Sequence, residues 1–499
     1  MILPITLSIL VLPLTNVFAN PLTPNAASTP VNVTTCNGKK YVYSSLAGYG
    51  LLPSNARDKH GDTIGGIGSA IALDKSSLKF SKRTQSYSGI IYGLPDRGWN
   101  TQGTQNTQSR IHKISFTFNI VGDKATVANP ASPNFKFEVV DTILLTGPDE
   151  TPLTGLDPTD TITYPGFPTL PLAKYTGNGF GQPGSGGSRI PLDTEGLVLG
   201  PNSTFYISDE YAATIYHFSS SGTMISATPP PPALLPRRNS TLSFSAASPP
   251  IYAPNTTITP EDPTTGRANN QGLEALTMSP DGKYLYTMLQ SATMQDGGKS
   301  SSKRRNTRFL VYRISSSATL KLEAEYQFLV LARDSGAGRG QAAAESVYRN
   351  ADVIDISGAT NILGTSADDV DGQVASRDGK LKDGITPAVY CPWLSFNVNS
   401  QLNRFGVRNG GAQDAGLLNE KWESFAVLPV DKDDEVGKSG KEKEEGDDYY
   451  LLSFSDNDFI TQNGYINNGQ TQYQDASGFN LDSQVLVFKV KFPKGAKPL

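Results

Sequence analysis

One short pattern recurs along the chain and limits what it can fold into. In each copy an acidic residue lies among small and apolar residues, and a strand ending in polar residues follows after a variable insert. Three copies contain the acid; they are Thr194-Glu195-Gly196-Leu197 before residues 205–210, Leu273-Glu274-Ala275-Leu276 before residues 284–290, and Trp422-Glu423-Ser424-Phe425 before residues 450–456. A fourth copy, over residues 65–97, lacks the acid. Such repetition predicts units that each bury an apolar face against the next.

The composition indicates that these units are β-sheets. The chain has 48 Gly and 34 Pro with 9% aromatic residues, which suits many short strands joined by turns. Residues 111–118 alternate apolar and polar side chains, as expected of a strand with one buried face. We therefore predict an all-β fold, a β-propeller of about six or seven blades. Two inserts rich in Pro, over residues 147–191 and 229–263, are expected to be long loops without regular structure.

In a propeller the equivalent residues of successive units converge on the central axis. Glu195, Glu274 and Glu423 are therefore predicted to meet, and converging carboxylates need a cation, basic side chains or protons beside them. Ca²⁺ takes six to eight oxygen ligands, so these residues are predicted metal ligands. Asp209 and Asp456, at the ends of the following strands, are further candidates, as are Glu210 and Asp458. The alternative is that each Glu caps a strand or pairs with a basic residue of its own unit.

Two Arg-Asp pairs are the candidate groups for binding an anion. Asp96-Arg97-Gly98 follows a strand, and Arg333-Asp334 repeats the pairing. A guanidinium near the axis can hold a phosphate or carboxylate through two hydrogen bonds. We list Glu274, Arg97 and Arg333 as candidate catalytic residues; the alternative is an Arg-Asp bridge between neighbouring units.

The beginning of the chain has the features of an exported protein. Residues 1–19 contain an apolar run and end in Val17-Phe18-Ala19, a pattern that signal peptidase accepts, so we predict a signal peptide. A leader over residues 20–45 then precedes one domain over residues 46–492. Sequons agree with secretion and predict a glycoprotein; they lie at Asn32, Asn202, Asn239 and Asn255. Cys36 and Cys391 can pair in an oxidising compartment, and a structural disulfide is favoured over a catalytic thiol.

Several functions are disfavoured. A formal charge of −4 and a pI near 5.6 give no basic surface for nucleic acid or an acidic membrane. After the signal peptide no stretch is apolar enough to span a bilayer. The chain has no G-x-S-x-G elbow, P-loop, H-E-x-x-H or C-x-x-C motif. We expect a monomer that acts on a small molecule without a protein nucleophile.

The chain resembles the phytase-like family, labelled "esterase-like activity of phytase". The segments that carry the resemblance are residues 190–197, 206–211, 269–276, 279–283 and 329–334, with Trp422-Glu423 and residues 454–458 near the end. They occur in the family's order between about Leu46 and Lys491. The resemblance implies a secreted propeller related to calcium-dependent phytases, in which central acidic residues hold Ca²⁺ that binds substrate phosphate and activates water.

Three positions depart from the family pattern. Ala332 replaces a Glu before Arg-Asp, and Ala275 and Ser424 replace a Gly after the recurring Glu. The combined expectation is a secreted, calcium-dependent phosphoester hydrolase. Two alternatives remain open: a non-catalytic propeller that binds a sugar, peptide or wall component, and a metal-dependent ester or lactone hydrolase on the same fold.

Overall fold

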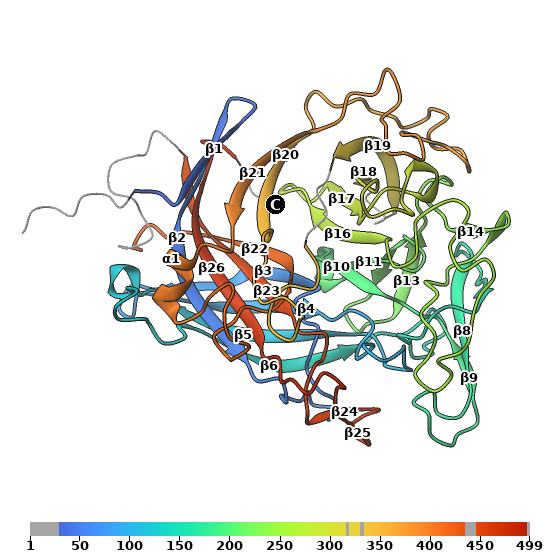
Figure 1. Ribbon diagram of the computed structural model, residues 1–499, viewed down its shortest axis with the longest axis horizontal. Coiled ribbons are helices and arrows are strands. Elements are labelled where there is room, and N and C mark those ends of the chain that lie inside the picture. The colour runs from blue at the N-terminus through green and yellow to red at the C-terminus, as the bar shows by residue number, and fades with distance from the viewer. Residues whose placement is uncertain (1–28, 316–318, 330–333, 435–445, 497–499) are drawn as a thin grey trace, which may run out of the picture.

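The structure is a computed structural model that describes residues 29–315, 319–329, 334–434 and 446–496 (Figure 1). The predicted signal peptide and Arg333 lie outside these ranges. The described residues form antiparallel β-sheets with one short α-helix, α1 (Asn399–Leu402). The predicted all-β class is therefore confirmed.

Four sheets of four or five strands make up most of the fold. Three of them follow the chain order from the first strand to the last. Their strands are β3 (Ala70–Ser81), β4 (Ser86–Leu94), β5 (Arg110–Asn119) and β6 (Phe135–Leu144); β10 (Thr194–Leu199), β11 (Phe205–Asp209), β12 (Ile215–Phe218) and β13 (Met224–Thr228); β16 (Leu273–Met278), β17 (Tyr284–Leu289), β18 (Asn306–Ile314) and β19 (Leu320–Leu329).

The fourth sheet joins the two ends of the chain. Its strands, in spatial order, are β22 (Lys421–Pro429), β23 (Asp447–Asp456), β26 (Ser483–Phe492), β2 (Lys39–Leu52) and β1 (Asn32–Cys36). The predicted leader, residues 20–45, thus supplies β1 and the beginning of β2 to this sheet. Cys36 of β1 forms the expected disulfide with Cys391, 355 residues further along the chain.

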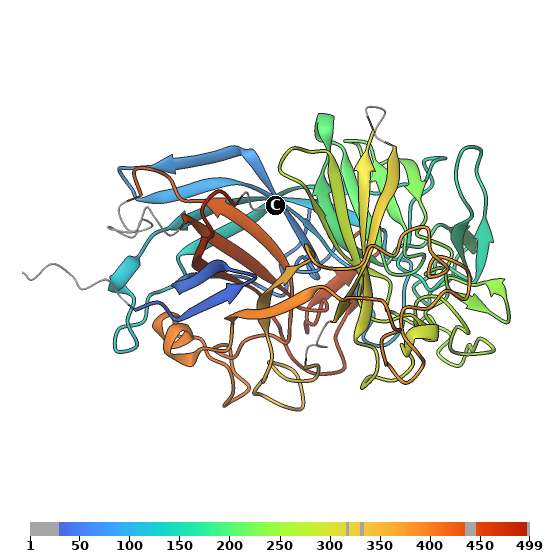
Figure 2. The ribbon, with the colours of Figure 1, turned by 90° about the horizontal axis from the view of Figure 1, so that it is seen from above.

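The first strands of the four sheets lie side by side. β22 contacts β3, β3 contacts β10, and β10 contacts β16. Figures 1 and 2 show the sheets extending outward from these strands in a propeller-like arrangement. The sheets of the described residues do not fix the number of blades, so six or seven blades stays a prediction.

Smaller sheets fill the connections. They are β20 (Asn350–Asp355) with β21 (Val389–Ser395), β7 (Asp160–Ile162) with β8 (Leu170–Tyr175) and β9 (Gly187–Arg189), β14 (Arg237–Arg238) with β15 (Thr241–Leu242), and β24 (Gly464–Ile466) with β25 (Thr471–Tyr473). The expectation that residues 147–191 and 229–263 lack regular structure was wrong, because backbone pairing within each insert forms β7–β9 and β14–β15.

The core lies between the sheets. On β5 the predicted apolar face is buried, with Ile114, Phe116 and Phe118 at most 3% exposed. Phe118 packs against Tyr450 of β23 in the next sheet, with ring centroids 5.1 Å apart. This packing fixes the relative position of the sheets, and with it the side chains at their inner edges. No helix in the described part of the chain is long and apolar enough to cross a membrane.

Candidate functional site

The recurring glutamates occupy the same local structure in three sheets. The pairing of β10 with β11 skips Glu195, that of β16 with β17 skips Glu274, and that of β22 with β23 skips Glu423. A β-bulge leaves its extra residue outside the ladder and changes the direction of its side chain. The repeated sequence pattern is therefore a repeated bulge near the start of each inner strand.

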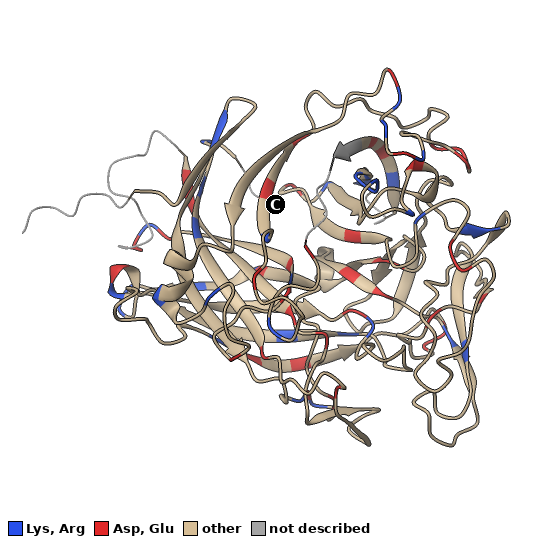
Figure 3. Ribbon diagram, viewed as in Figure 1, with Lys and Arg blue, Asp and Glu red and all other residues tan. Residues whose placement is uncertain are grey.

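The three glutamates are close enough for the charges of Glu274 and Glu423 to act on Glu195. Burial, and then the negative charges of Glu274, Asp193, Glu210 and Glu423, raise the pKa of Glu195 well above its usual value. Glu274 and Glu423 are half-buried. Figure 3 shows acidic residues on the inner strands near the middle of the molecule.

A first cluster of carboxylates forms around Glu195. Oxygen atoms of Asp193, Glu195 and Glu210 lie within 4.8 Å of one another. Asp193 and Glu210 are each 1% exposed. No N–H or O–H group of the described residues donates a hydrogen bond to either carboxylate oxygen of Glu210. Burial and the charges of Glu274 and Asp193 raise the pKa of Glu210. Buried oxygens without donors are expected where a ligand completes the site.

A second cluster lies at the inner edge of the neighbouring sheets. Oxygen atoms of Asp96, Asp456 and Asp458 lie within 4.8 Å of one another. Lys421 Nζ is 3.2 Å from Asp456 Oδ2 and 2.6 Å from Asp458 Oδ1. Burial raises the pKa of Asp456 to about 7, although Lys421 opposes this. Burial, and then the charge of Asp456, raise the pKa of Asp96. Thr194, next to Asp193, donates from its Oγ1 to the Asp96 carbonyl at 3.2 Å, so the two clusters are neighbours.

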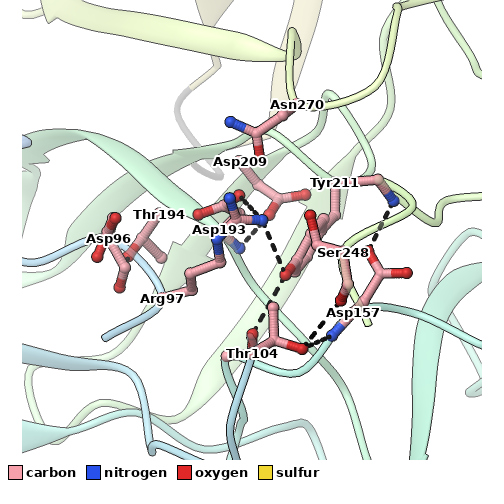
Figure 4. A network of polar contacts seen from close by, with 12 residues as sticks. Asp96, Arg97, Thr104, Asp157, Asp193, Thr194, Asp209, Tyr211, Ser248 and Asn270 are labelled. Atoms are coloured by element: carbon pink, nitrogen blue, oxygen red, sulfur yellow. Dashed lines mark hydrogen bonds and ion pairs between the residues drawn. The ribbon is translucent and has the colours of Figure 1, made fainter. Parts of the chain in front are cut away.

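Arg97 lies beside the first cluster, in the network that Figure 4 shows. Its Nη1 is 2.9 Å from Asp193 Oδ2 and donates to Tyr211 Oη at 3.3 Å. Tyr211 Oη in turn donates to the Gly155 carbonyl. A side chain at Gly155 would place its Cβ 2.0 Å from the Arg97 carbonyl oxygen, so glycine is required for this close approach. Arg97 is thus held at the edge of the carboxylates.

A second arginine lies behind this network. The guanidinium of Arg267 is fully buried and donates to the carbonyl oxygens of Tyr211 and Phe244. Burial lowers the pKa of Arg267 to about 10, while the nearby Glu210 charge opposes this effect. Arg267 therefore supports the backbone of the site and adds a positive charge near the first cluster.

The other predicted residues differ in their surroundings. Asp209 accepts hydrogen bonds from the backbone N–H groups of Asp193 and Ala212, at 2.8 and 2.6 Å. These bonds hold the chain segment that carries Asp193, and the assignment of Asp209 as a metal ligand stays a prediction. Glu274 Oε1 accepts a hydrogen bond from Gln290 at 3.1 Å. Arg333 lies outside the described residues.

The structure also adds residues that the sequence analysis did not select. Asp193 and Lys421 are each two residues before a recurring glutamate, Glu195 and Glu423. The third copy has Gly272 at this position, where a Cβ would lie 2.2 Å from the Glu210 carbonyl oxygen. Alignment of the copies on their glutamates would have identified this position as one that faces the centre.

The donor set suits a hard cation. Both clusters consist of carboxylates, which are the ligands that Ca²⁺ prefers. The two buried oxygens of Glu210 without donors are an independent indication that a cation fits the first cluster. The described residues thus contain two adjacent groups of three carboxylates, each with a basic side chain at its edge.

Comparison with known proteins identifies the family of this chain. The family model described as "Phytase-like: Esterase-like activity of phytase" matches residues 76–383. The chain belongs to the phytase-like family. A relative from Arthroderma benhamiae, called an uncharacterized secreted protein, is 48% identical over an alignment of 469 residues, and the alignment covers 87% of this phytase-like protein and 90% of the relative. The predicted family and the predicted secretion of the protein are therefore confirmed.

Solved structures resemble this phytase-like protein only weakly. A luciferin-regenerating enzyme is 10% identical, with 85% of this chain and 97% of that chain covered and a TM-score of 0.22. An auxiliary nutrient binding protein from Bacteroides thetaiotaomicron is 9% identical, with 91% and 77% covered and a TM-score of 0.24. At these scores neither structure carries an argument about function.

Proposed function

We propose that this phytase-like protein is a Ca²⁺-dependent hydrolase of phosphoesters. The observation that carries the proposal is the pair of adjacent carboxylate clusters with Arg97 at their edge. A site that binds phosphate needs positive charge close to the metal ligands, and Arg97 and Lys421 supply it. An ester or lactone hydrolase has no such need, so these cations favour phosphate chemistry over that alternative.

The balance of charges supports a bound cation. The two clusters, together with Glu274 and Glu423, contribute eight carboxylates, and these are Asp96, Asp193, Glu195, Glu210, Glu274, Glu423, Asp456 and Asp458. The cationic side chains that interact with them are Arg97, Arg267 and Lys421. Buried like charges are costly unless they are neutralised by protons or cations. Two Ca²⁺ ions would restore most of the balance.

Asp193, Glu195 and Glu210 would hold one ion, and Asp96, Asp456 and Asp458 the other. Bound Ca²⁺ would polarise a phosphoryl oxygen and lower the pKa of water. Arg97 donates to another phosphoryl oxygen and orients the group. Glu274, held by Gln290, accepts the proton of the attacking water. The water oxygen forms a bond to phosphorus and the bond from phosphorus to the ester oxygen breaks. The ester oxygen takes the proton that Glu274 accepted and leaves as the alcohol. Arg333 stays a candidate for the same role as Arg97.

The test is phosphate release by the purified mature protein. The substrates are phytate and p-nitrophenyl phosphate, each with added Ca²⁺ and with chelator. We expect turnover that requires Ca²⁺ and falls at least 100-fold in Glu274→Gln. In Glu210→Gln the Ca²⁺ concentration for half-maximal activity should rise at least tenfold. Glu150→Gln, which changes an exposed loop glutamate, is the matched control and should behave as the parent protein.

Thermal unfolding gives a readout that does not depend on turnover. Because a cation must displace protons from carboxyls with raised pKa values, Ca²⁺ should raise the Tm more at pH 7.5 than at pH 5. The shift should shrink in Glu210→Gln and persist in Glu150→Gln. A Ca²⁺-dependent Tm without phosphate release from any ester would contradict the hydrolase and favour the binding propeller. The absence of any Ca²⁺ effect would contradict the metal site.

A further inference from the structure

A cavity of about 450 Å³ lies beside the carboxylate clusters. Arg97, Asn100 and Gln102 line it from the loop after β4, and Ser248 and Pro249 line it from the loop between β15 and β16. Its volume is within the range of about 300–1,000 Å³ that small-molecule sites occupy. Because Arg97 also pairs with Asp193, a single guanidinium connects the cavity to the first cluster.

The two walls of the cavity are bonded to each other. Thr104 Oγ1 donates to the Ser248 carbonyl at 3.1 Å, and the Thr104 N–H donates to the Pro249 carbonyl at 3.2 Å. Figure 4 shows Thr104 and Ser248 next to each other on the side of Arg97 away from Asp96. Gly103 has a φ of 127°, and a Cβ there would lie 2.7 Å from the Ile251 Cα. These contacts form the cavity in advance, which lowers the cost of ordering it around a ligand.

The chemistry of the lining indicates what the cavity binds. Asn100 and Gln102 present amides, and Ser248 presents a hydroxyl, and these groups can both donate and accept hydrogen bonds. Such groups match the hydroxyls of a sugar or another polyol. Among the described residues that line the cavity, Arg97 alone carries a charge. It is partly neutralised by Asp193 at 2.9 Å.

This single charge limits how many phosphates the cavity accepts. Each phosphate monoester adds about 1.5 to 2 negative charges at neutral pH. The first phosphate can lie between Arg97 and the carboxylate clusters, but a second would lie in a cavity whose other lining residues carry no charge. A second phosphate would therefore lose hydration without gaining a cationic partner, a cost that a monophosphate avoids.

We propose that the cavity holds the alcohol part of the substrate and selects a polyhydroxy compound with one phosphate group over compounds with several. The inference rests on the proposed hydrolase function, because it assigns the reacting phosphate to the adjacent clusters. It separates this protein from an enzyme built to hold phytate, whose six phosphates would need many basic side chains.

Calorimetric titration of the full mature protein tests the selection without requiring turnover. The probes are fructose 6-phosphate and fructose 1,6-bisphosphate, which differ by one phosphate. Both are titrated at the same fixed concentration of Ca²⁺. We expect the monophosphate to bind at least tenfold more tightly. Gln102→Lys adds a positive charge to the cavity and should reduce this preference at least threefold. Ser221→Lys adds the same charge at the exposed turn after β12 and should leave the preference unchanged.

The outcomes separate the two proposals. Tighter binding of the bisphosphate, or a preference that Gln102→Lys leaves unchanged, would overturn the selection even if the protein hydrolyses phosphoesters. No binding of either sugar phosphate would also overturn it. Selective binding of the monophosphate without phosphate release would support the cavity as a ligand site and contradict the hydrolase function instead.

Discussion

At the scale of single residues, neighbouring carboxylates have different roles because their donors differ. Asp209 and Glu210 are consecutive at the end of β11, and both are buried. The oxygens of Asp209 receive backbone N–H groups, whereas those of Glu210 receive no donor from the described residues. The strand-end position was visible in the sequence. Which carboxylate faces the centre depends on the direction of the chain after the strand, which the sequence pattern does not contain.

His112 provides a prediction at this scale. It is fully buried on β5, and burial with the nearby charge of Arg110 lowers its pKa to about 3. The unfolded chain takes up a proton near pH 6.5. The native state resists this protonation, so the associated stability is complete above pH 6.5 and is lost as the pH falls toward 3. The loss from this residue should reach about 3 kcal/mol at pH 4.5.

Urea unfolding at pH 7.5 and at pH 4.5 measures this contribution. His112→Gln should lose less stability between the two pH values than the parent protein. Ser221→Gln, at an exposed turn without a titrating side chain, is the control and should keep the dependence of the parent. An equal loss in the His112 variant and the parent would show that His112 is not the titrating group.

At the scale of elements, the bulges explain why the recurring pattern has its particular residues. A bulged glutamate needs small neighbours where the inner strands approach closely. A Cβ at Gly196 would lie 2.5 Å from the Leu276 Cβ of the next sheet. The copy without an acid also follows this rule, because Gly68 packs on the backbone of Ser455 and Asp456. In this copy the acidic residue is Asp96, which follows β4, and it takes the place of a bulged glutamate.

Gly68→Ala should therefore damage both stability and the site. The added Cβ would lie 2.1 Å from the Ser455 carbonyl carbon and 2.2 Å from the Asp456 nitrogen, so the backbone that carries Asp456 must move. Overpacking of this kind costs about 1–3 kcal/mol. We expect a lower free energy of unfolding in urea and a weaker Ca²⁺ shift of the Tm. Gly358→Ala, where a Cβ meets no atom within 4 Å, is the matched control; similar results for both variants would refute the close packing.

At the scale of the whole molecule, the chain ends close the fold. β26 pairs with both β2 and β23, so strands from the two ends of the chain share one sheet. The Cys36–Cys391 disulfide fastens β1 to β21 outside that sheet. The exposed positions of the sequons Asn32, Asn202, Asn239 and Asn255 are compatible with glycosylation, which stays a prediction.

Removal of the disulfide should destabilise the fold without removing the site. A double variant, Cys36→Ser with Cys391→Ser, should lose about 2–5 kcal/mol of stability, since the bridge closes a very long loop of the unfolded chain. The carboxylate clusters lie on other elements, so Ca²⁺ should still raise the Tm of the variant. Reduction of the disulfide in the parent protein should lower its free energy of unfolding in urea by the same amount. The same treatment should leave the stability of the double variant unchanged. An unchanged stability in the variant would refute the contribution of the bridge.

The sequence by itself determined the all-β class and the recurring Glu195, Glu274 and Glu423, because alternation, turn residues and a repeated motif are local properties. It left Cys36 and Cys391 as a possible pair, and the structure decided that they are close enough to bridge. The tertiary structure decided that Asp193 and Lys421 join the three glutamates, that Glu210 faces the centre, and that Arg97 lies between a cavity and the carboxylates. Some of these residues, such as Asp193 and Lys421, are more than 200 positions apart in the chain, and packing between sheets brings them together. Such distances depend on the order and spacing of whole sheets, which no local pattern encodes.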